Sequence, residues 1–240
     1  MVAFAGNSVL CRLALKGMHA DAISFSSLRL ISGAIALFFF IAITSDSRKF
    51  EFKWLNALLL CIYVFSFSIA YVSLSTGAGA LLLFGTVQLV MTVWGIAQGE
   101  KLVILKITGI LGALAGIAIL LLPGAERPSL YAAIMMVIAG LAWAFYSITG
   151  KKITDAAAST GGNFILAIPV ALIIPLFFHS HLHIDIYGLV LGVLSGAITS
   201  GGAYLLWYSL LPLLRSTMAS TIQLSVPCLA TLGGIIFLGE

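Results

Sequence analysis

Charged residues are scarce in this sequence: Asp, Glu, Lys and Arg make up only 8% of its 240 residues, whereas 61% are hydrophobic. A water-soluble domain carries roughly 25% charged residues, so this chain has too few polar side chains to cover a particle in water. Its mean hydropathy of +1.17 agrees with this. The composition excludes a soluble domain and predicts a membrane protein for which lipid is the main solvent.

Carboxylates and histidines are missing from the middle of the apolar runs. The acidic residues all fall in predicted loops or at predicted helix ends, namely Asp21, Asp46, Glu51, Glu100, Glu126, Asp155, Asp185 and Glu240. Many proton- or sodium-coupled carriers use a buried carboxylate relay, and none is visible here. The apolar runs also contain no His-x-x-x-His pair and no phosphate loop, so we expect no enzyme, no metal site and no cofactor.

Cysteine is rare, and the three cysteines are isolated within apolar runs: Cys11, Cys61 and Cys228. We expect them to act as small hydrophobic residues rather than to form a disulfide. The histidine-rich stretch from His179 to His183 could bind a metal if it were extended, but a solvated loop is the favoured interpretation.

Long apolar runs fill the rest of the chain. A helix crosses a bilayer in about 20 residues, with a range of roughly 17–25. Nine runs approach this length: 2–18, 24–44, 54–75, 79–98, 103–122, 130–149, 162–178, 187–211 and 217–238. Each is expected to be a helix, because an open strand would leave unpaired backbone groups in lipid. The predicted fold class is an all-α polytopic membrane protein.

Lys and Arg are distributed unevenly between the alternating loops. One side carries Arg48, Lys49, Lys53, Lys101, Lys106, Lys151, Lys152 and Arg215, and the other carries Lys16 and Arg127, with Arg12 near a helix end. The positive-inside rule places the first side and the N-terminus in the cytoplasm. We therefore expect a multi-pass protein of the bacterial inner (plasma) membrane, with the lipid bilayer and a small-molecule substrate as its partners. Because the basic residues lie in short loops, no nucleic-acid partner is expected.

Two apolar segments of the chain resemble each other. Residues 79–100 (GALLLFGTVQLVMTVWGIAQGE) and 219–240 (ASTIQLSVPCLATLGGIIFLGE) each contain a glutamine and end in Gly-Glu. A similar offset of about 140 residues relates Ser8 to Ser147, Arg12 to Lys151 and Phe25 to Phe164. We expect two repeats, 1–122 with five helices and 130–240 with four. A unit of five helices is odd, so the repeats would be inverted in the membrane. The chain is expected to lack the last helix of a ten-helix parent.

The residues also resemble a known family. The opening AFAGNSVLCRLAL (3–15), Phe25 four residues before Arg29, the stretch AGLAWAFYSITGKK (139–152), the Pro227 helix and the Gly-Glu endings are similar to EamA-type proteins of the drug/metabolite transporter superfamily. The resemblance covers essentially the whole chain. It implies two inverted five-helix repeats around a central cavity lined by helices one, three, four, six, eight and nine. The sequence departs from the family pattern in two ways. The first repeat has Val87 where the second has Pro227, and the last helix of the family is missing.

Polar and aromatic side chains within the runs are the candidates for a substrate site, since polar groups are costly in lipid. Glutamine can recognise a polar solute without a fixed charge, or it can join helices by a hydrogen bond. Trp143 and Tyr146 share one face of their helix and could line a cavity or form an interfacial belt. We expect substrate-binding residues among Asn7, Gln88, Trp143, Tyr146, Ser147, Tyr204, Trp207 and Gln223. Tyr208, near the basic side, could be a belt residue.

Three residues are candidates for gating or coupling. Arg29 could snorkel to the outer interface, which is the favoured alternative, or pair with a substrate carboxylate. Glu100 is expected to cap the following helix, at 103–122, with proton coupling as the alternative. Pro227 removes a backbone hydrogen bond and could serve as a hinge.

The leading hypothesis is a secondary transporter that exports a small polar or amphipathic metabolite, with amino acids as the main class. The alternative is a non-transporting membrane fragment or scaffold that associates through glycine faces such as Gly188, Gly192 and Gly196. Association of this kind would make the protein a homo-oligomer.

Overall fold

The protein was analysed as a computed structural model that describes residues 1–44, 50–100, 108–109, 111–112, 115–116, 129–178 and 182–240. The first half contains α1 (Val2–Lys16), α2 (Ala22–Thr44), α3 (Trp54–Tyr71) and α4 (Thr76–Ala97). The second half contains α6 (Leu130–Gly150), α7 (Ala156–Phe177), α8 (Ile186–Leu194), a π-helix η2 (Ser195–Gly202), α9 (Ala203–Leu210), a short 3-10 turn η3 (Leu211–Leu213), α10 (Ser216–Gln223) and α11 (Ser225–Leu238).

The all-helical prediction is confirmed for the described residues, in which the only bridge of β type joins Ala20 to Ile184. Seven helical stretches there are long and apolar enough to cross a membrane, with Ile186–Leu213 and Ser216–Leu238 each counted as one. The first helix, α1, has 15 residues and is shorter than these. The expected helix at 103–122 lies largely outside the described residues. The chain is thus a multi-pass membrane protein.

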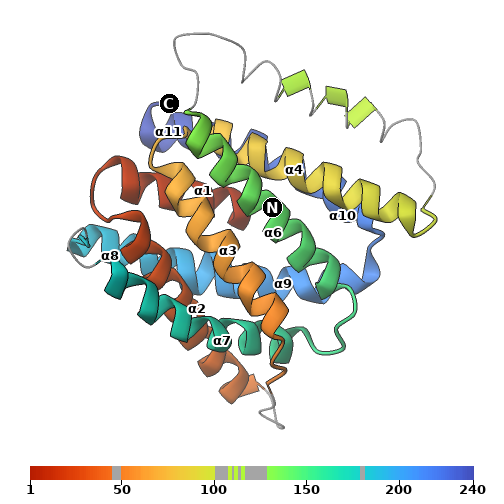
Figure 1. The fold of residues 1–240 in the computed structure, drawn as a ribbon, viewed down its shortest axis with the longest axis horizontal. Coiled ribbons are helices and arrows are strands. Elements are labelled where there is room, and N and C mark those ends of the chain that lie inside the picture. Colours follow the sequence, from red (N-terminus) through yellow and green to blue (C-terminus); the bar gives the residue numbers. More distant parts are fainter. Residues whose placement is uncertain (45–49, 101–107, 110, 113–114, 117–128, 179–181) are drawn as a thin grey trace.

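Helices from the two halves of the chain lie against one another throughout the bundle (Figure 1). α3 crosses α6, α2 runs along α7, and α4 contacts both α6 and α11. α1 lies between α11 on one side and α8 and η2 on the other. The core therefore forms between the halves rather than within each half.

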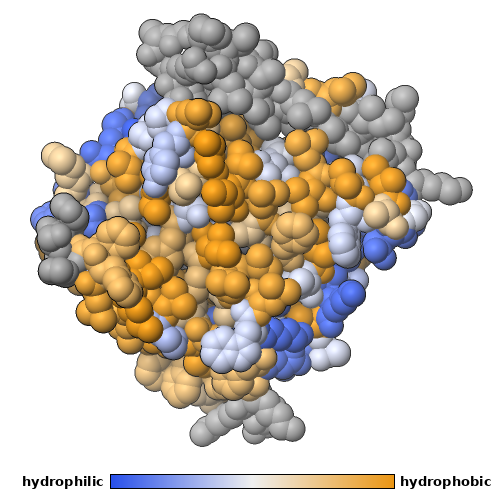
Figure 2. Space-filling model, viewed as in Figure 1, coloured by the Kyte–Doolittle hydropathy of each residue, from blue (hydrophilic) through white to orange (hydrophobic). Residues whose placement is uncertain are grey.

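The surface is apolar over most of the viewed face, and hydrophilic residues gather at its left and lower right margins (Figure 2). Bulky side chains such as Phe38, Phe39 and Phe40 are about half exposed on α2. A soluble protein rarely exposes such an extended apolar area, whereas lipid covers it at no cost.

Connecting segments meet at the two ends of the bundle. At one end, the backbone N–H of Asp21 donates to His183 O, and that of Asp185 donates to His19 O, both at 2.8 Å. At the other end, the N–H of Glu51 donates to Ala158 O at 3.0 Å. These pairs join segments that the sequence places on the same side of the membrane, so the alternation of the helices agrees with the predicted one.

A row of glycines brings the second half against α2. A Cβ added at Gly192 would meet Leu28 Cδ2 at 2.6 Å, and one at Gly196 would overlap Ser32 Oγ and lie 2.3 Å from Arg29 O. Gly188 faces the His19 backbone in the same way. The glycine face is therefore used inside this chain, where it lets η2 contact the backbone of α2.

Replacing Gly196 by alanine should destabilise the protein by about 1–3 kcal/mol, because the added methyl group has no space between η2 and α2. The matched control is Gly202→Ala in the same π-helix, where the nearest atom to an added Cβ lies 3.6 Å away. Melting temperatures of both purified variants in detergent test this. Equal stability of the two would contradict the close approach.

Candidate functional site

Aromatic rings fill the centre of the bundle, where α1, α3, α6 and α9 meet. Phe4 lies edge-on to Trp143, with their ring centroids 5.4 Å apart. Trp143 in turn lies 5.0 Å from Tyr63 and 4.7 Å from Tyr204. Trp207 contacts Phe4 at 5.9 Å. Residues from both halves of the chain thus build one aromatic cluster.

Each indole of this cluster donates a hydrogen bond to a polar side chain. Trp143 Nε1 donates to Gln223 Oε1 at 2.7 Å, and Trp207 Nε1 donates to Ser147 Oγ at 3.1 Å. The amide of Gln223 also donates to Ala219 O within its own helix. The cluster is therefore amphipathic, with flat apolar surfaces and amide or hydroxyl groups at its edges.

All eight predicted substrate-binding residues are buried. Six of them are joined by ring contacts or hydrogen bonds: Trp143, Tyr146, Ser147, Tyr204, Trp207 and Gln223. Asn7 lies apart from this network and accepts hydrogen bonds from Ser195 Oγ at 2.7 Å and Thr199 Oγ1 at 3.2 Å on η2. Gln88 donates to Thr92 on its own helix, and its Oε1 atom has no partner among the described residues.

Two expectations for aromatic residues are settled by burial. Trp143 is only 2% exposed, so the interfacial-belt alternative does not apply to it. The expectation of a belt residue at Tyr208 is wrong: this side chain is fully buried, and its hydroxyl donates to Tyr146 O at 3.0 Å. Its position near a helix end suggested an interface, but α9 turns this face toward α6.

The snorkelling expected for Arg29 is also wrong. Its side chain is fully buried and hydrogen bonds to Ser200, Tyr63 and Tyr204. Snorkelling needs an open path to the interface, and here α3, η2 and α9 surround the guanidinium group. Sequence reasoning missed Tyr63 and Ser200 because a single polar residue in an apolar run gives no signal of its partner.

Glu100 follows the C-terminal end of α4 and binds the N-terminus of a helix from the other half. Its Oε1 accepts from the backbone N–H of Ser216 at 2.8 Å, and its Oε2 accepts from that of Thr217 at 3.0 Å. Lys151 Nζ lies 3.9 Å from Oε1. We call these residues the Glu100 cluster. The carboxylate caps α10, a partner that the sequence did not predict, while the start of the expected helix at 103–122 lies outside the described residues.

Glu240 forms the equivalent arrangement at the opposite end of α4. Its Oε2 accepts from the backbone N–H of Thr76 at 2.6 Å, at the start of α4, and its Oε1 accepts from Arg12 Nε at 2.8 Å. Lys16 Nζ lies 3.7 Å from Oε1. We call these residues the Glu240 cluster. Since α4 has 22 residues, the two clusters are separated by about 33 Å.

Both clusters depend on a glycine with positive φ just before the glutamate. Gly99 has φ +83° and Gly239 has φ +64°, a region that other residues rarely adopt. The next backbone N–H then turns back onto the helix, from Glu100 to Gly95 O and from Glu240 to Gly234 O. This turn directs each carboxylate toward the neighbouring helix, which explains the repeated Gly-Glu endings.

Pro227 lies near the start of α11, next to a break between α10 and α11 at Leu224. Proline has no N–H to donate to the carbonyl four residues earlier, which belongs to Gln223. The corresponding helix in the first half, α4, has Val87 in this position and is continuous. The break therefore sits beside the glutamine that binds Trp143.

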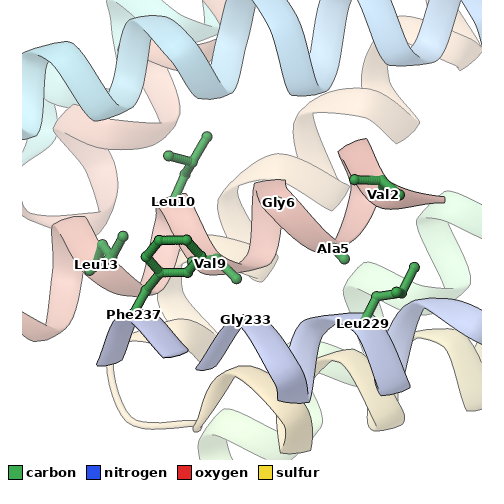
Figure 3. A pocket seen from close by; sticks show the side chains of 9 residues that line it. All are labelled: Val2, Ala5, Gly6, Val9, Leu10, Leu13, Leu229, Gly233 and Phe237. Carbon is green, nitrogen blue, oxygen red and sulfur yellow. The ribbon is translucent and has the colours of Figure 1, made fainter. Parts of the chain in front are cut away.

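One pocket among the described residues is an apolar cleft between α1 and α11, with a volume of about 400 Å³. Figure 3 shows Val9, Leu10 and Phe237 along it. Gly233 lets the helices approach, since an added Cβ would lie 2.6 Å from Val9 Cγ2. The lining contains no polar side chain that could orient a solute, so this cleft does not correspond to the central cavity expected from the sequence.

Comparisons with known proteins give the following matches. A profile of the EamA-like transporter family matches residues 130–240. An uncharacterized protein of Pseudomonas aeruginosa is 45% identical over 241 residues, which cover all of this chain and 84% of that protein. An uncharacterized transporter of Archaeoglobus fulgidus is 22% identical over 263 residues, covering all of this chain and 87% of that protein. A crystal structure with 17% identity aligns with a TM-score of 0.68 over 98% of this chain and 86% of that one, and so shares the fold.

The two glutamate clusters make stability depend on pH. Burial raises the pKa of Glu100, but the hydrogen bonds from Thr217 and Ser216 and the charge of Lys151 outweigh it, so the pKa lies below the ordinary 4.5. The pKa of Glu240 is lowered against burial by Thr76 and Arg12. A carboxyl group whose pKa is lower in the folded than in the unfolded state stabilises the fold above pH 4.5. This stabilisation is lost as the pH falls through the folded pKa.

Glu100→Gln and Glu240→Gln should therefore each lower the melting temperature at pH 7, and the difference from the parent protein should shrink as the pH falls below about 4.5. Glu51→Gln, in the more exposed pair with Lys53 at 3.3 Å, serves as a control with a small effect. A constant difference between pH 7 and pH 4 would contradict the proposed charge dependence.

Proposed function

We propose that this chain, which belongs to the EamA-like transporter family, exports a small polar or amphipathic metabolite across the bacterial inner membrane, with amino acids as the leading class. The protein is a multi-pass membrane transporter. Its orientation, with the N-terminus in the cytoplasm, follows the distribution of Lys and Arg and is part of the proposal.

The observation that carries the proposal is the buried amphipathic cluster at the centre of the bundle. Trp143 and Tyr204 offer flat apolar surfaces, and Gln223 offers an amide at the edge. Such a combination suits a solute with an apolar body and a few polar groups. No acidic side chain joins this cluster among the described residues, which favours recognition by neutral groups and one cation.

The second part of the proposal is alternating access by two inverted repeats, 1–122 and 130–240. The helix contacts support it, because they occur in pairs that an exchange of the repeats would produce. The exchange replaces α1 by α6, α3 by the α8–η2–α9 stretch, and α4 by α10 and α11. The contact of α3 with α6 then corresponds to that of η2 with α1, and the contact of α4 with α6 corresponds to that of α11 with α1. α2 contacts its equivalent helix α7, and α4 contacts its equivalents α10 and α11, so these contacts are unchanged by the exchange.

The glutamate clusters supply the gates for such a mechanism. Each joins the C-terminal end of a helix in one repeat to the start of a helix in the other, and Arg12 and Lys151 occupy equivalent places in the two. Because the clusters lie at opposite ends of α4, opening one of them would admit solute from one side of the membrane only. Closing both, as in this structure, occludes the centre.

The scaffold alternative loses one of its supports. Its glycine face at Gly188, Gly192 and Gly196 is covered by α1–α2 residues of the same chain. Association into a homo-oligomer would have to use another surface. A non-transporting fragment remains the competing function, and a transport assay separates it from the proposal.

Purified protein in liposomes should catalyse counterflow of at least one labelled amino acid. Gln88→Ala and Trp143→Ala should reduce the rate at least about tenfold, because each removes a buried polar or aromatic contact that a bound solute would use. The matched controls are Gln98→Ala at the exposed end of α4 and Phe145→Ala on the exposed face of α6. No counterflow of any amino acid or nucleobase by the parent protein would contradict the proposal.

The gates can be tested with two buried thiols. Cys11 lies on α1 beside the Glu240 cluster, and Ser147→Cys places a second thiol on α6 beside the Glu100 cluster. Each is used as the single cysteine in proteoliposomes treated with a maleimide. Glu240→Gln should raise the labelling rate of Cys11 several-fold and lower that of the thiol at position 147, and Glu100→Gln should do the reverse. Equal increases at both thiols in either variant would indicate general loosening and contradict alternating gates.

A further inference from the structure

Arg29 carries a buried positive charge that no acidic side chain balances among the described residues. It is fully buried in the first half of α2. The described ion pairs all involve other cations, at the ends of helices or in connections. An isolated charge inside a bundle of this kind costs several kcal/mol, so a partner that is not part of the described chain is expected.

The guanidinium group is held in a fixed position with one nitrogen free. Nε donates to Ser200 Oγ at 2.7 Å, and Nη2 donates to the hydroxyl groups of Tyr204 and Tyr63, the latter at 3.3 Å. Its central carbon lies 5.3 Å from the ring centroid of Tyr63 and 5.1 Å from that of Phe67. The buried Nη1 has no hydrogen-bond partner. Three neutral hydroxyls orient the group but do not neutralise it.

We propose that Arg29 binds the carboxylate of the transported solute through Nη1. This rests on the proposed function and adds the charge of the substrate to it. A guanidinium group matches the planar geometry of a carboxylate, and a hydrogen bond between opposite charges is about twice as strong as a neutral one. The hydroxyl groups of Tyr63 and Tyr204 accept from Arg29, and a phenol hydroxyl can also donate its proton to an anion that replaces a present partner.

A monocarboxylate suits the charge of this site better than a phosphate. A phosphate group carries about −1.5 to −2 charge at pH 7, which one guanidinium cannot balance. The other described cations sit at the helix ends, in or near the two glutamate clusters and the connections. One positive charge in an otherwise neutral, aromatic environment therefore selects a solute with a single negative group and an apolar body.

The amino group of such a solute would also find acceptors. Gln88 Oε1 and Asn163 Oδ1 are buried amide oxygens without hydrogen-bond partners among the described residues. The Asn163 side chain donates to the hydroxyl of Tyr146, whose ring stacks on Trp143 at 5.6 Å. The described residues thus supply one free cationic donor, an aromatic wall and free acceptors, which is the set of groups that recognises an apolar zwitterionic amino acid.

The test compares matched ligands by the thermal shift of the purified protein, which reports binding without transport. The probes are L-phenylalanine and L-leucine, their carboxamides, the amines 2-phenylethylamine and 3-methylbutylamine, and sodium phosphate and chloride. At least one amino acid should stabilise the parent protein, and its carboxamide and amine should not. Arg29→Gln should weaken that amino acid about 10- to 100-fold and abolish the preference for the carboxylate, the loss expected for one hydrogen bond to a charged group.

Two further variants keep the test decisive if Arg29→Gln does not fold. Arg29→Lys retains the charge and should retain part of the preference for the carboxylate. Tyr63→Phe keeps the arginine but removes one hydroxyl, and should reduce the preference. Lys53→Gln removes a cation at the start of α3, outside the site, and should leave ligand binding unchanged.

Equal stabilisation by an amino acid and its carboxamide, or an unchanged preference in Arg29→Gln, would overturn the inference and give Arg29 a purely structural role. Stabilisation by phosphate or chloride that excludes every amino acid would also overturn it. Counterflow of a solute without carboxylate preference would leave the proposed function in place while this inference fails. Binding that depends on Arg29 without any counterflow would support this inference while the proposed transport function fails.

Discussion

A buried guanidinium group, Arg29, with no acidic partner in the described part of the chain is the constraint on which the centre of this structure depends. Arg29 has to be surrounded by acceptors, and these come from three different elements, α3, η2 and α9. The π-helix turn at Ser195–Gly202 places Ser200 within 2.7 Å of Nε, while Gly196 allows the backbone of η2 to approach α2. Aromatic rings also pack around the charge, so the same side chains determine both the packing and the electrostatics of the centre.

The ends of the bundle solve a different problem with carboxylates. A helix that starts at the membrane surface has unpaired N–H groups, and Glu100 and Glu240 satisfy them for α10 and α4. Each glutamate also meets a cation of an equivalent position, Lys151 or Arg12. These bonds lie at the ends of helices, outside the aromatic centre. A packed centre with polar contacts at both ends of the bundle is consistent with the alternating access proposed above.

Much of the architecture was predictable from the sequence, because the length and hydropathy of an apolar run identify a membrane helix. The stretches expected at 24–44, 130–149 and 217–238 are helical, although the last is divided at Leu224. The partners of polar residues were not predictable. Arg29 was expected at an interface, since no nearby sequence pattern points to Ser200 or Tyr204, and Glu100 caps a helix 116 positions further along the chain. Such contacts depend on how distant helices pack, which a single sequence does not encode locally.

If Arg29 holds a carboxylate inside the bundle, its guanidinium nitrogens must lie close to the carboxyl carbon of the bound solute. Solid-state NMR can measure this in proteoliposomes, with nitrogen-15 in the arginine guanidinium groups and carbon-13 in the carboxyl group of the most stabilising amino acid. A direct hydrogen bond places the two nuclei within about 4 Å of each other, which gives strong dipolar dephasing. The account predicts this dephasing in the parent protein and its loss in Arg29→Lys. No dephasing in the parent protein with ligand bound, or dephasing that persists in the variant, would contradict it.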